Sequence, residues 1–180
     1  MSGMNASAVP GEQSDAEIVY GLASSSLGTV LVARKATGVC AILLGDSAER
    51  LKRDLGEIFR NYKFTRQDQA LSSEISAAVD IAERPWAPFQ PPLAIGGTEF
   101  QRIVWSAVSE VPPGSTVSYS EIARRIGAPA SLRAVAGACA ANILAIAIPC
   151  HRILRSNGTL SGYRWGLERK RKLIEREKRH

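Results

Sequence analysis

The sequence has few of the residues that build metal centres and disulfide frameworks. Its 180 residues include three cysteines (Cys40, Cys139 and Cys150) and two histidines (His151 and His180). No CxxC pair occurs, and an odd number of widely spaced cysteines argues against a disulfide framework. A zinc site of histidine and cysteine ligands is hard to build from this set. We therefore expect reduced thiols, no metal and no other cofactor.

Long apolar runs are also missing. The chain has no run of about 18 apolar residues, which a membrane helix needs. Its N-terminus lacks the charged start and continuous apolar stretch of a signal peptide. We expect a soluble, cytoplasmic protein that does not contact a membrane. Residues 1–16 mix Ser, Gly, Asn, Pro and acids without periodicity, which predicts a disordered leader.

Acidic residues are scarce in the second half of the chain. Residues 101–180 carry 14 Lys and Arg against 5 Asp and Glu, whereas residues 1–100 carry 9 against 12. The basic excess fits a surface that binds phosphate groups. The runs 169–172 and 176–179 would equally suit the solvated C-terminus of an exposed helix. Both interpretations stay open.

The first half contains signals for a small sheet and two helices. Segments 28–33 and 39–44 flank a short polar turn and predict a β-hairpin, with Cys40 in its core. Ser47 is predicted to cap a helix that runs to about Asn61, and a second helix is expected over residues 72–83. Four prolines between residues 84 and 92 interrupt any regular element. We place a domain boundary there, which separates residues 17–92 from residues 93–180.

The second half predicts a group of short helices. Thr98 is expected to cap a helix that ends at Pro112-Pro113-Gly114. The pattern Ser118-x-x-Glu121 has the form of a capping box and would open a helix to Ile126. After a turn at residues 127–130, another helix would run from Ser131 to about Ala141. Two short helices joined by such a turn are typical of a helix-turn-helix.

The predicted helix 131–141 carries almost no polar side chains. One stripe, which we expect to face the core, contains Leu132, Val135, Ala136 and Cys139. The opposite side presents Arg133 among the small residues Gly137, Ala140 and Ala141. Because a recognition helix normally displays several polar groups to base edges, this pattern predicts close backbone approach to DNA without sequence-specific readout. A plain alanine-rich packing helix is the alternative.

One tetrapeptide, Pro149-Cys150-His151-Arg152, follows the apolar run 144–148. The run closed by proline predicts a buried strand or tight segment that carries Cys150 to the edge of a core. A cysteine reacts as its thiolate, so it needs a base or a positive charge nearby, which His151 or Arg152 could supply. Neighbours on an extended chain point to opposite faces, so a turn or a bridging water would be required. The alternative is that Cys150 is a small buried hydrophobe.

Three segments, 133–142, 148–153 and 158–166, together closely resemble the O6-alkylguanine-DNA alkyltransferases. The resemblance is strongest to the C-terminal half of the bacterial adaptive-response proteins and extends less specifically back to about Tyr20. It implies an α/β (α+β) protein. The N-terminal domain would be a small ribonuclease-H-like domain of sheet and helices, and the C-terminal domain a helical, winged-helix-type DNA-binding domain.

The resemblance implies direct repair of DNA. A monomer would bind double-stranded DNA, associating with the nucleoid, and would take the alkyl group from O6-alkylguanine, or from O4-methylthymine, onto Cys150. His151 would act as a base through a water, oriented by Glu177. Asn142 would bridge the helix-turn-helix to the active-site turn, and Tyr119 would donate a hydrogen bond toward the guanine ring. Each molecule would act once, because the product is a stable thioether.

The resemblance also implies contacts with DNA and with the flipped base. Arg133 would fill the space that the base leaves, and the further DNA contacts would be Tyr119, Ser120, Ala134, Gly137 and Ala140. Guanine would meet the carbonyls of Cys150 and Ile153. The loop 161–166, with Tyr163, Arg164 and Trp165, would close over it. Animal members have small residues where this chain has Arg164 and Trp165, so we expect a narrower pocket that favours methyl over benzyl.

Three other functions compete with this interpretation. An alkyltransferase-like protein would bind the lesion without repairing it, but such proteins replace the acceptor cysteine. A helix-turn-helix regulator would need polar base contacts, which the Arg133 helix lacks. We also expect no counterpart of the cysteine-rich regulatory domain of the adaptive-response proteins. A cysteine hydrolase would turn over many times, whereas an alkyl acceptor reacts once.

Overall fold

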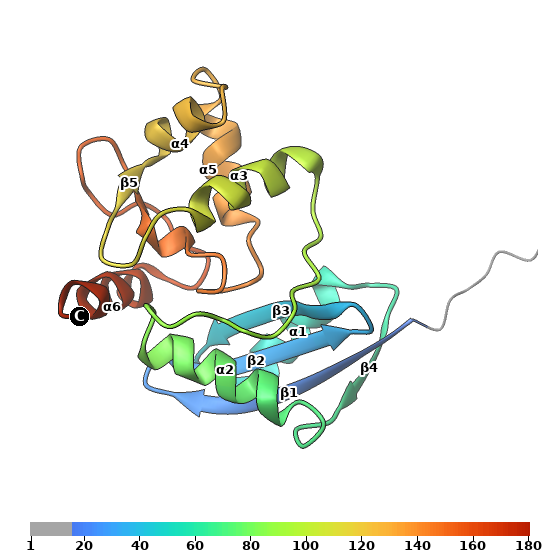
Figure 1. Ribbon diagram of the computed structural model, residues 1–180. Coiled ribbons are helices and arrows are strands. Elements are labelled where there is room, and N and C mark those ends of the chain that lie inside the picture. Colours follow the sequence, from blue (N-terminus) through green and yellow to red (C-terminus); the bar gives the residue numbers. More distant parts are fainter. Residues whose placement is uncertain (1–15) are drawn as a thin grey trace, which may run out of the picture.

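The computed structural model describes residues 16–180, and Figure 1 shows a sheet domain below a cluster of helices. The predicted leader lies outside the described residues except for Ala16. Within residues 16–180, no helix is both long and apolar enough to cross a bilayer.

A four-stranded sheet forms the base of the molecule. Its strands are β1 (Glu17–Ser25), β2 (Gly28–Lys35), β3 (Gly38–Gly45) and β4 (Lys63–Arg66). They lie in the order β3-β2-β1-β4, with β4 parallel to β1 and the other pairs antiparallel. The predicted hairpin is confirmed as β2 and β3, in which Val32 pairs with Ile42, and Cys40 is buried. The sequence did not predict β1 or β4.

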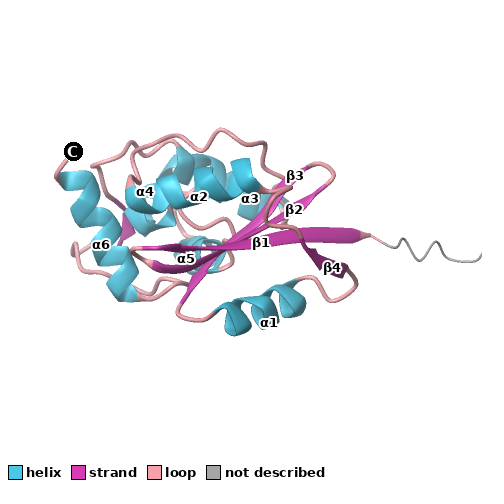
Figure 2. Cartoon of the chain, turned by 90° about the horizontal axis from the view of Figure 1, so that it is seen from below, coloured by secondary structure: helices cyan, strands magenta, loops and turns pink. Residues whose placement is uncertain are grey.

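Two helices cover opposite faces of this sheet, as the edge-on view in Figure 2 shows. They are α1 (Ala48–Ile58) and α2 (Ser72–Glu83). Ser47 caps α1 as predicted, because its side chain accepts a hydrogen bond from the Arg50 amide. The helix ends three residues before the predicted Asn61, since Phe59 leaves the helical conformation (φ −118°, ψ 64°).

The second half contains α3 (Glu99–Ser109), α4 (Tyr119–Arg125) and α5 (Leu132–Ala140), a 3-10 turn η1 (Cys150–Arg152), and α6 (Leu167–Lys178). The short strands β5 (Val117–Ser118) and β6 (Ile153–Leu154) pair in parallel. Thr98 caps α3 through a full capping box with Gln101, in agreement with the prediction. Only half of the box predicted at Ser118 forms. Its hydroxyl accepts from the Glu121 amide, but the Glu121 carboxylate binds Arg124 and Arg125 instead.

The prediction for the core face of α5 was partly wrong. Val135 and Cys139 are buried as expected, and Ala138 is buried with them. Leu132, by contrast, is 46% exposed, and Ala136 is also exposed. The helix packs between α3 and α4 on its 135–139 side, where the Trp105 indole donates to the Ala138 carbonyl at 2.8 Å. Its Leu132 side faces a cavity.

Residues 144–148 form a tight buried turn, not a strand. Leu144 makes a single bridge to Ile42 of β3, and the chain then folds back so that the Ile148 amide donates to the Leu144 carbonyl. Ile146 adopts φ +68°, which is costly for a β-branched residue. This turn delivers Pro149 and Cys150 to the start of η1.

Helix α6 connects the two halves of the molecule. Arg169 donates from Nε to the Leu27 carbonyl at 2.6 Å, and Arg176 donates from Nη2 to the Ser26 hydroxyl at 2.6 Å. Both acceptors lie in the β1–β2 turn. One hydrophobic core also runs through both halves. The boundary near residue 92 stays a prediction.

Candidate active site

The thiol of Cys150 lies at the start of η1, almost completely buried. The neighbouring Cys139 thiol and burial raise the pKa of Cys150 well above the ordinary value, while Asn142 and Lys170 act in the opposite direction. In the resting protein Cys150 is therefore a neutral thiol, and its reaction as a nucleophile needs a base.

The candidate base is His151, whose side chain forms a buried hydrogen-bonded group with those of Glu177 and Arg152. Nε2 of His151 lies 2.8 Å from Oε1 of Glu177, and both side chains are buried. Arg152 donates from Nε and Nη2 to the same carboxylate and from Nη1 to the Val111 carbonyl. These bonds lower the pKa of Glu177 to about 2 against the effect of burial, so the group stays ionised.

The protonation of His151 follows from this arrangement. Burial lowers the pKa of the imidazole, so the ring is neutral near pH 7. Because Glu177 can only accept a hydrogen bond, Nε2 carries the proton and Nδ1 carries a free lone pair. Nδ1 is buried and has no hydrogen-bond partner among the described residues. The ring thus presents an unoccupied basic nitrogen next to Cys150 in the chain.

Asn142 fixes the turn that leads to Cys150. Its Nδ2 donates to the Ile148 carbonyl at 2.9 Å, and its Oδ1 accepts from the Leu144 amide at 2.8 Å. Asn142 is itself buried just after the end of α5. One side chain therefore links α5 to both ends of the turn that precedes Cys150.

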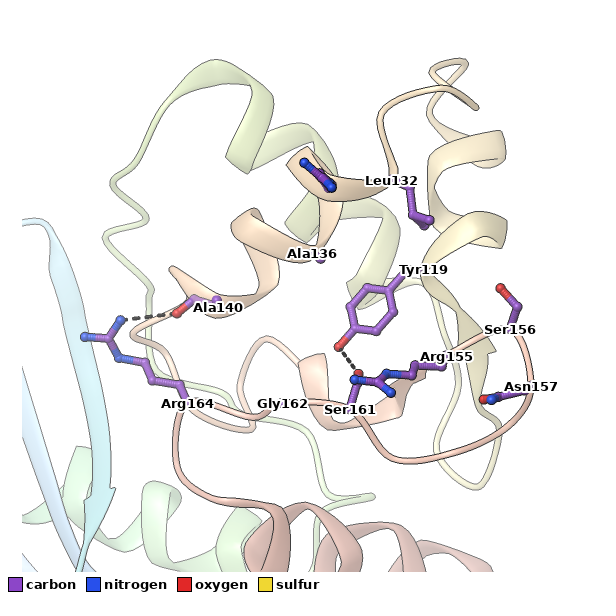
Figure 3. Close-up of a pocket in the computed structure, with 11 residues that line it drawn as sticks. Tyr119, Leu132, Ala136, Ala140, Arg155, Ser156, Asn157, Ser161, Gly162 and Arg164 are labelled. Carbon is purple, nitrogen blue, oxygen red and sulfur yellow. Dashed lines mark hydrogen bonds between the residues drawn. The ribbon is translucent and has the colours of Figure 1, made fainter.

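A cavity of about 650 Å³ opens beside α5. Figure 3 shows Leu132, Ala136 and Ala140 along one wall, with Tyr119 pointing into the space between α5 and the loop 155–164. The remaining lining residues are Arg133, Arg155, Ser156, Asn157, Ser161, Gly162 and Arg164. The walls combine small apolar groups with arginines, which suits a flat ring attached to a phosphate backbone.

Two hydrogen bonds across this cavity position its polar groups (Figure 3). Ser161 donates to the Tyr119 hydroxyl oxygen at 2.8 Å, so the Tyr119 proton is free to be donated elsewhere. Burial raises the pKa of Tyr119, which keeps that proton in place. On the opposite side, Arg164 donates to the Ala140 carbonyl at 3.2 Å.

The structure brings together most of the residues predicted for the site, and it corrects others. Trp165 does not line the cavity; its ring is buried in the core, so it does not narrow the pocket. Cys150, Ile153 and Tyr163 do not line the cavity either. Ser120 lies at its rim, where its hydroxyl is 3.0 Å from that of Ser156.

No group of three or more potential metal ligands occurs within residues 16–180.

Comparison with known proteins places this geometry in a family. The family model described as 6-O-methylguanine DNA methyltransferase, DNA binding domain, matches residues 99–179. The bifunctional transcriptional activator/DNA repair enzyme Ada of Escherichia coli is 46% identical over 158 residues, which are 88% of this chain and 45% of Ada. The crystal structure of the Mycobacterium tuberculosis O6-methylguanine methyltransferase superposes with a TM-score of 0.70 at 32% identity. That match covers 90% of this chain and 93% of the other.

The chain belongs to the O6-methylguanine-DNA methyltransferase family. It spans about half the length of the curated relatives it matches. A structure of the Mycobacterium tuberculosis family member OGT in complex with DNA also superposes, with a TM-score of 0.70 at 32% identity over 89% of this chain and 93% of that one. The predicted mixed α/β fold, with a small sheet domain and a helical domain, is confirmed by these matches.

Two residues of this candidate site were missed from the sequence. Lys170 belongs to the basic run 169–172, for which a phosphate-binding surface and a solvated helix end were both open, but its side chain is completely buried. Its Nζ donates to the carbonyls of Ile153 at 2.6 Å and Ser161 at 3.3 Å. Cys139 was expected to be a core residue only, yet it is the partner of the Cys150 thiol. Arg152, considered as a source of positive charge for that thiol, is instead bound to Glu177.

Proposed function

We propose that the chain repairs double-stranded DNA by moving the alkyl group of O6-alkylguanine, and of O4-methylthymine, irreversibly to Sγ of its own Cys150. The observation that carries the proposal is the buried His151–Glu177 pair, in which His151 directly follows the buried Cys150 in the chain and has a free basic nitrogen at Nδ1. Membership of the O6-methylguanine-DNA methyltransferase family supports the substrate.

The reaction begins with loss of the thiol proton. It passes through a water to Nδ1 of His151, whose Nε2 proton stays hydrogen-bonded to the ionised Glu177. The thiolate then attacks the alkyl carbon in line with the C–O6 bond. A new C–S bond forms as the C–O6 bond breaks, and the electron pair stays on guanine. The product thioether has no leaving group as good as guanine, so each molecule acts once.

Guanine leaves more readily when its developing negative charge is stabilised. The Tyr119 hydroxyl has a free proton and points into the cavity, so it is placed to donate to a ring nitrogen. A fixed donor of this kind is worth roughly 3 kcal/mol of barrier lowering in other enzymes. As the family resemblance implies, the carbonyls of Cys150 and Ile153, which lie outside the cavity lining, would accept from the exocyclic amine of guanine. The Ile153 carbonyl also accepts from Lys170, and its second lone pair would take the amine.

The exposed face of α5 would lie against the DNA. Ala134, Gly137 and Ala140 are exposed and small, which lets the helix backbone approach the duplex closely. Arg133 projects from the same helix at the cavity and would fill the gap left in the base stack. Ser120 would also contact the DNA. We expect a monomer in the cytoplasm that binds DNA more weakly as salt rises.

The proposal is tested by intact mass and peptide mapping after incubation with a duplex that contains O6-methylguanine. We expect a gain of one CH2 group per chain, confined to the Cys150 peptide, that stops after one event. Cys150→Ala should bind the duplex and gain nothing. Tight binding by the unchanged protein without a mass gain would make it a lesion-binding protein, and repeated turnover would make it a hydrolase.

A further inference from the structure

Lys170 is the largest completely buried side chain in the described part of the chain. Its ammonium has no carboxylate partner there; it donates to the carbonyls of Ile153 and Ser161. Burying a charge without an opposite charge is costly, and two carbonyls offset only part of that cost. The mechanism above does not use this group, so its position needs another explanation.

The two carbonyls belong to different walls of the site. Ile153 directly follows the Cys150 turn, whereas Ser161 belongs to the loop that lines the cavity. The same ammonium lies 5.8 Å from the centre of the Tyr119 ring, within cation–π distance. Ser161 in turn donates to the Tyr119 hydroxyl. Lys170 therefore sits where the acceptor turn, the cavity loop and the guanine-facing tyrosine meet.

We propose that Lys170 is a positioning residue of the alkyl transfer: its ammonium ties the Cys150 turn to the cavity loop and Tyr119, and supplies the positive charge that faces the Cys150 thiolate as it forms. The inference rests on the proposed function, since it assigns a further role within the same site.

The groups around Lys170 support this role. The titratable groups that face it are Cys139 of α5, Cys150 and His151 of η1, and the ring of Tyr119 on α4. Glu177, further along α6, is occupied by His151 and Arg152. Burial keeps His151 and Tyr119 neutral near pH 7, so the two thiols are the groups that can become anions beside the ammonium. The charge of Lys170 lowers the pKa of both thiols, so it stabilises the Cys150 thiolate as it forms.

The pH range of the effect follows from burial. Burial lowers the pKa of Lys170 to about 8, and the two thiols oppose that shift. The positive charge is therefore present near neutral pH and is lost as the pH rises through this value. Thiolate formation beside it keeps the proton on Lys170 longer.

Three variants test the proposal. Lys170→Met keeps the length and removes both the charge and the donor, whereas Lys170→Gln keeps a neutral donor. Lys172→Met is the control, because Lys172 is exposed on the same helix. For each protein we would measure the single-turnover transfer rate at saturating DNA, the affinity for the lesion duplex, and the pH profile of iodoacetamide alkylation at Cys150. Trypsin cleavage at Arg155 and Arg164 reports the order of the loop.

We expect Lys170→Met to transfer at least about tenfold more slowly than Lys172→Met, with unchanged lesion affinity. The midpoint of its pH profile for iodoacetamide alkylation at Cys150 should move to higher pH. Trypsin should also cleave the cavity loop faster at Arg155 and Arg164. Lys170→Gln should show the same shift in pH profile with less cleavage of the loop. If Lys170→Met does not fold, Lys170→Gln alone decides the role of the charge.

Transfer and pH profiles that match those of Lys172→Met would overturn the proposal. So would slow transfer accompanied by an equal loss of lesion affinity and an unmoved pH profile, because that pattern indicates a structural role alone. The iodoacetamide reaction needs no DNA, so it separates the two hypotheses. A shifted profile in a protein that never accepts a methyl group would contradict the proposed function and not the role of Lys170.

Discussion

Nε2 of His151 lies 2.8 Å from Oε1 of Glu177, although 26 residues separate them in the chain. The same oxygen accepts from Nη2 of Arg152, also at 2.8 Å. The arginine keeps the carboxylate ionised, and the ionised carboxylate keeps the imidazole proton on Nε2. The basic character of Nδ1 thus depends on a residue two positions from Cys150 and on another at the end of the last helix.

Glu177→Gln should slow alkyl transfer by about 10²-fold. The glutamine amide can turn its NH2 group toward Nε2, which moves the imidazole proton to Nδ1 and removes the base. Glu175→Gln is the matched control, because Glu175 is exposed on the same helix. Single-turnover rates would be compared at pH 7.5, and equal rates for the two variants would contradict the role assigned to Glu177.

Glu177 should also make the protein sensitive to acid. Its pKa is lowered from an ordinary value of 4.5 to about 2 in the folded state. The unfolded chain therefore binds more protons in this range, and the stabilisation is lost as the pH falls from about 4.5 to 2. Urea unfolding at pH 7, 4.5 and 3 should show a steeper loss for Glu175→Gln than for Glu177→Gln. Parallel losses would rule out this contribution.

Local signals in the sequence predicted much of the fold, and the failures share one physical cause. The β2–β3 hairpin and the caps at Ser47 and Thr98 depend on neighbouring residues, so they can be identified locally. Strand β4 has a single large apolar residue, Phe64, and is stabilised by pairing with β1 across more than 40 positions. Such pairing leaves no local pattern.

The same limit applies to the candidate site. Cys150, His151 and Asn142 were identified because the segments 133–142 and 148–153 resemble those of the O6-alkylguanine-DNA alkyltransferases. Lys170 was missed because it stands in a run of basic residues, and its burial depends on carbonyls at positions 153 and 161. The period of α5 placed Leu132 on an apolar stripe, but periodicity alone cannot show that a cavity takes up part of that stripe.

Asn142→Ala should destabilise the protein by about 2 kcal/mol. It leaves the buried Leu144 amide unpaired and removes one of two donors from the Ile148 carbonyl, which keeps its bond from the Cys150 amide. The turn at residues 144–148 includes the strained Ile146, so it also loses the side chain that holds it in shape. We expect slower transfer as well. Asn61→Ala, at an exposed position, is the control in urea unfolding. A free energy of unfolding equal to that of the control would show that Asn142 does not hold the turn.

Cys139→Ala should make Cys150 more reactive at neutral pH. The pKa of the neighbouring Cys139 is lowered, so Cys139 takes the first negative charge of the pair, and that charge raises the pKa of Cys150. Removal of the Cys139 thiol therefore lowers the pKa of Cys150. The rate of iodoacetamide alkylation at Cys150, followed by peptide mass, should reach its midpoint at lower pH than in the unchanged protein. Cys40→Ala serves as the control, because burial raises the pKa of Cys40 to about 11 far from this pair. A midpoint that stays in place or rises would refute the coupling.

Arg164→Ala should raise the rate with O6-benzylguanine relative to O6-methylguanine by about tenfold. Arg164 lines the cavity and is fixed to the Ala140 carbonyl, so its removal widens the space for a larger alkyl group. Arg171→Ala, exposed on α6, is the control. If the unchanged protein already reacts equally fast with both substrates, Arg164 does not restrict the pocket.

Helix α6 presents two pairs of residues, each seven positions apart and so nearly two turns apart on the helix. Arg169 and Arg176 hold the β1–β2 turn, while Lys170 and Glu177 reach the reaction centre. The sheet domain contributes no residue to the proposed chemistry, yet it holds the position and rotation of the helix that carries two positioning residues. A fragment cut at the proline-rich crossover would keep every residue of the chemistry and lose the support that aligns it.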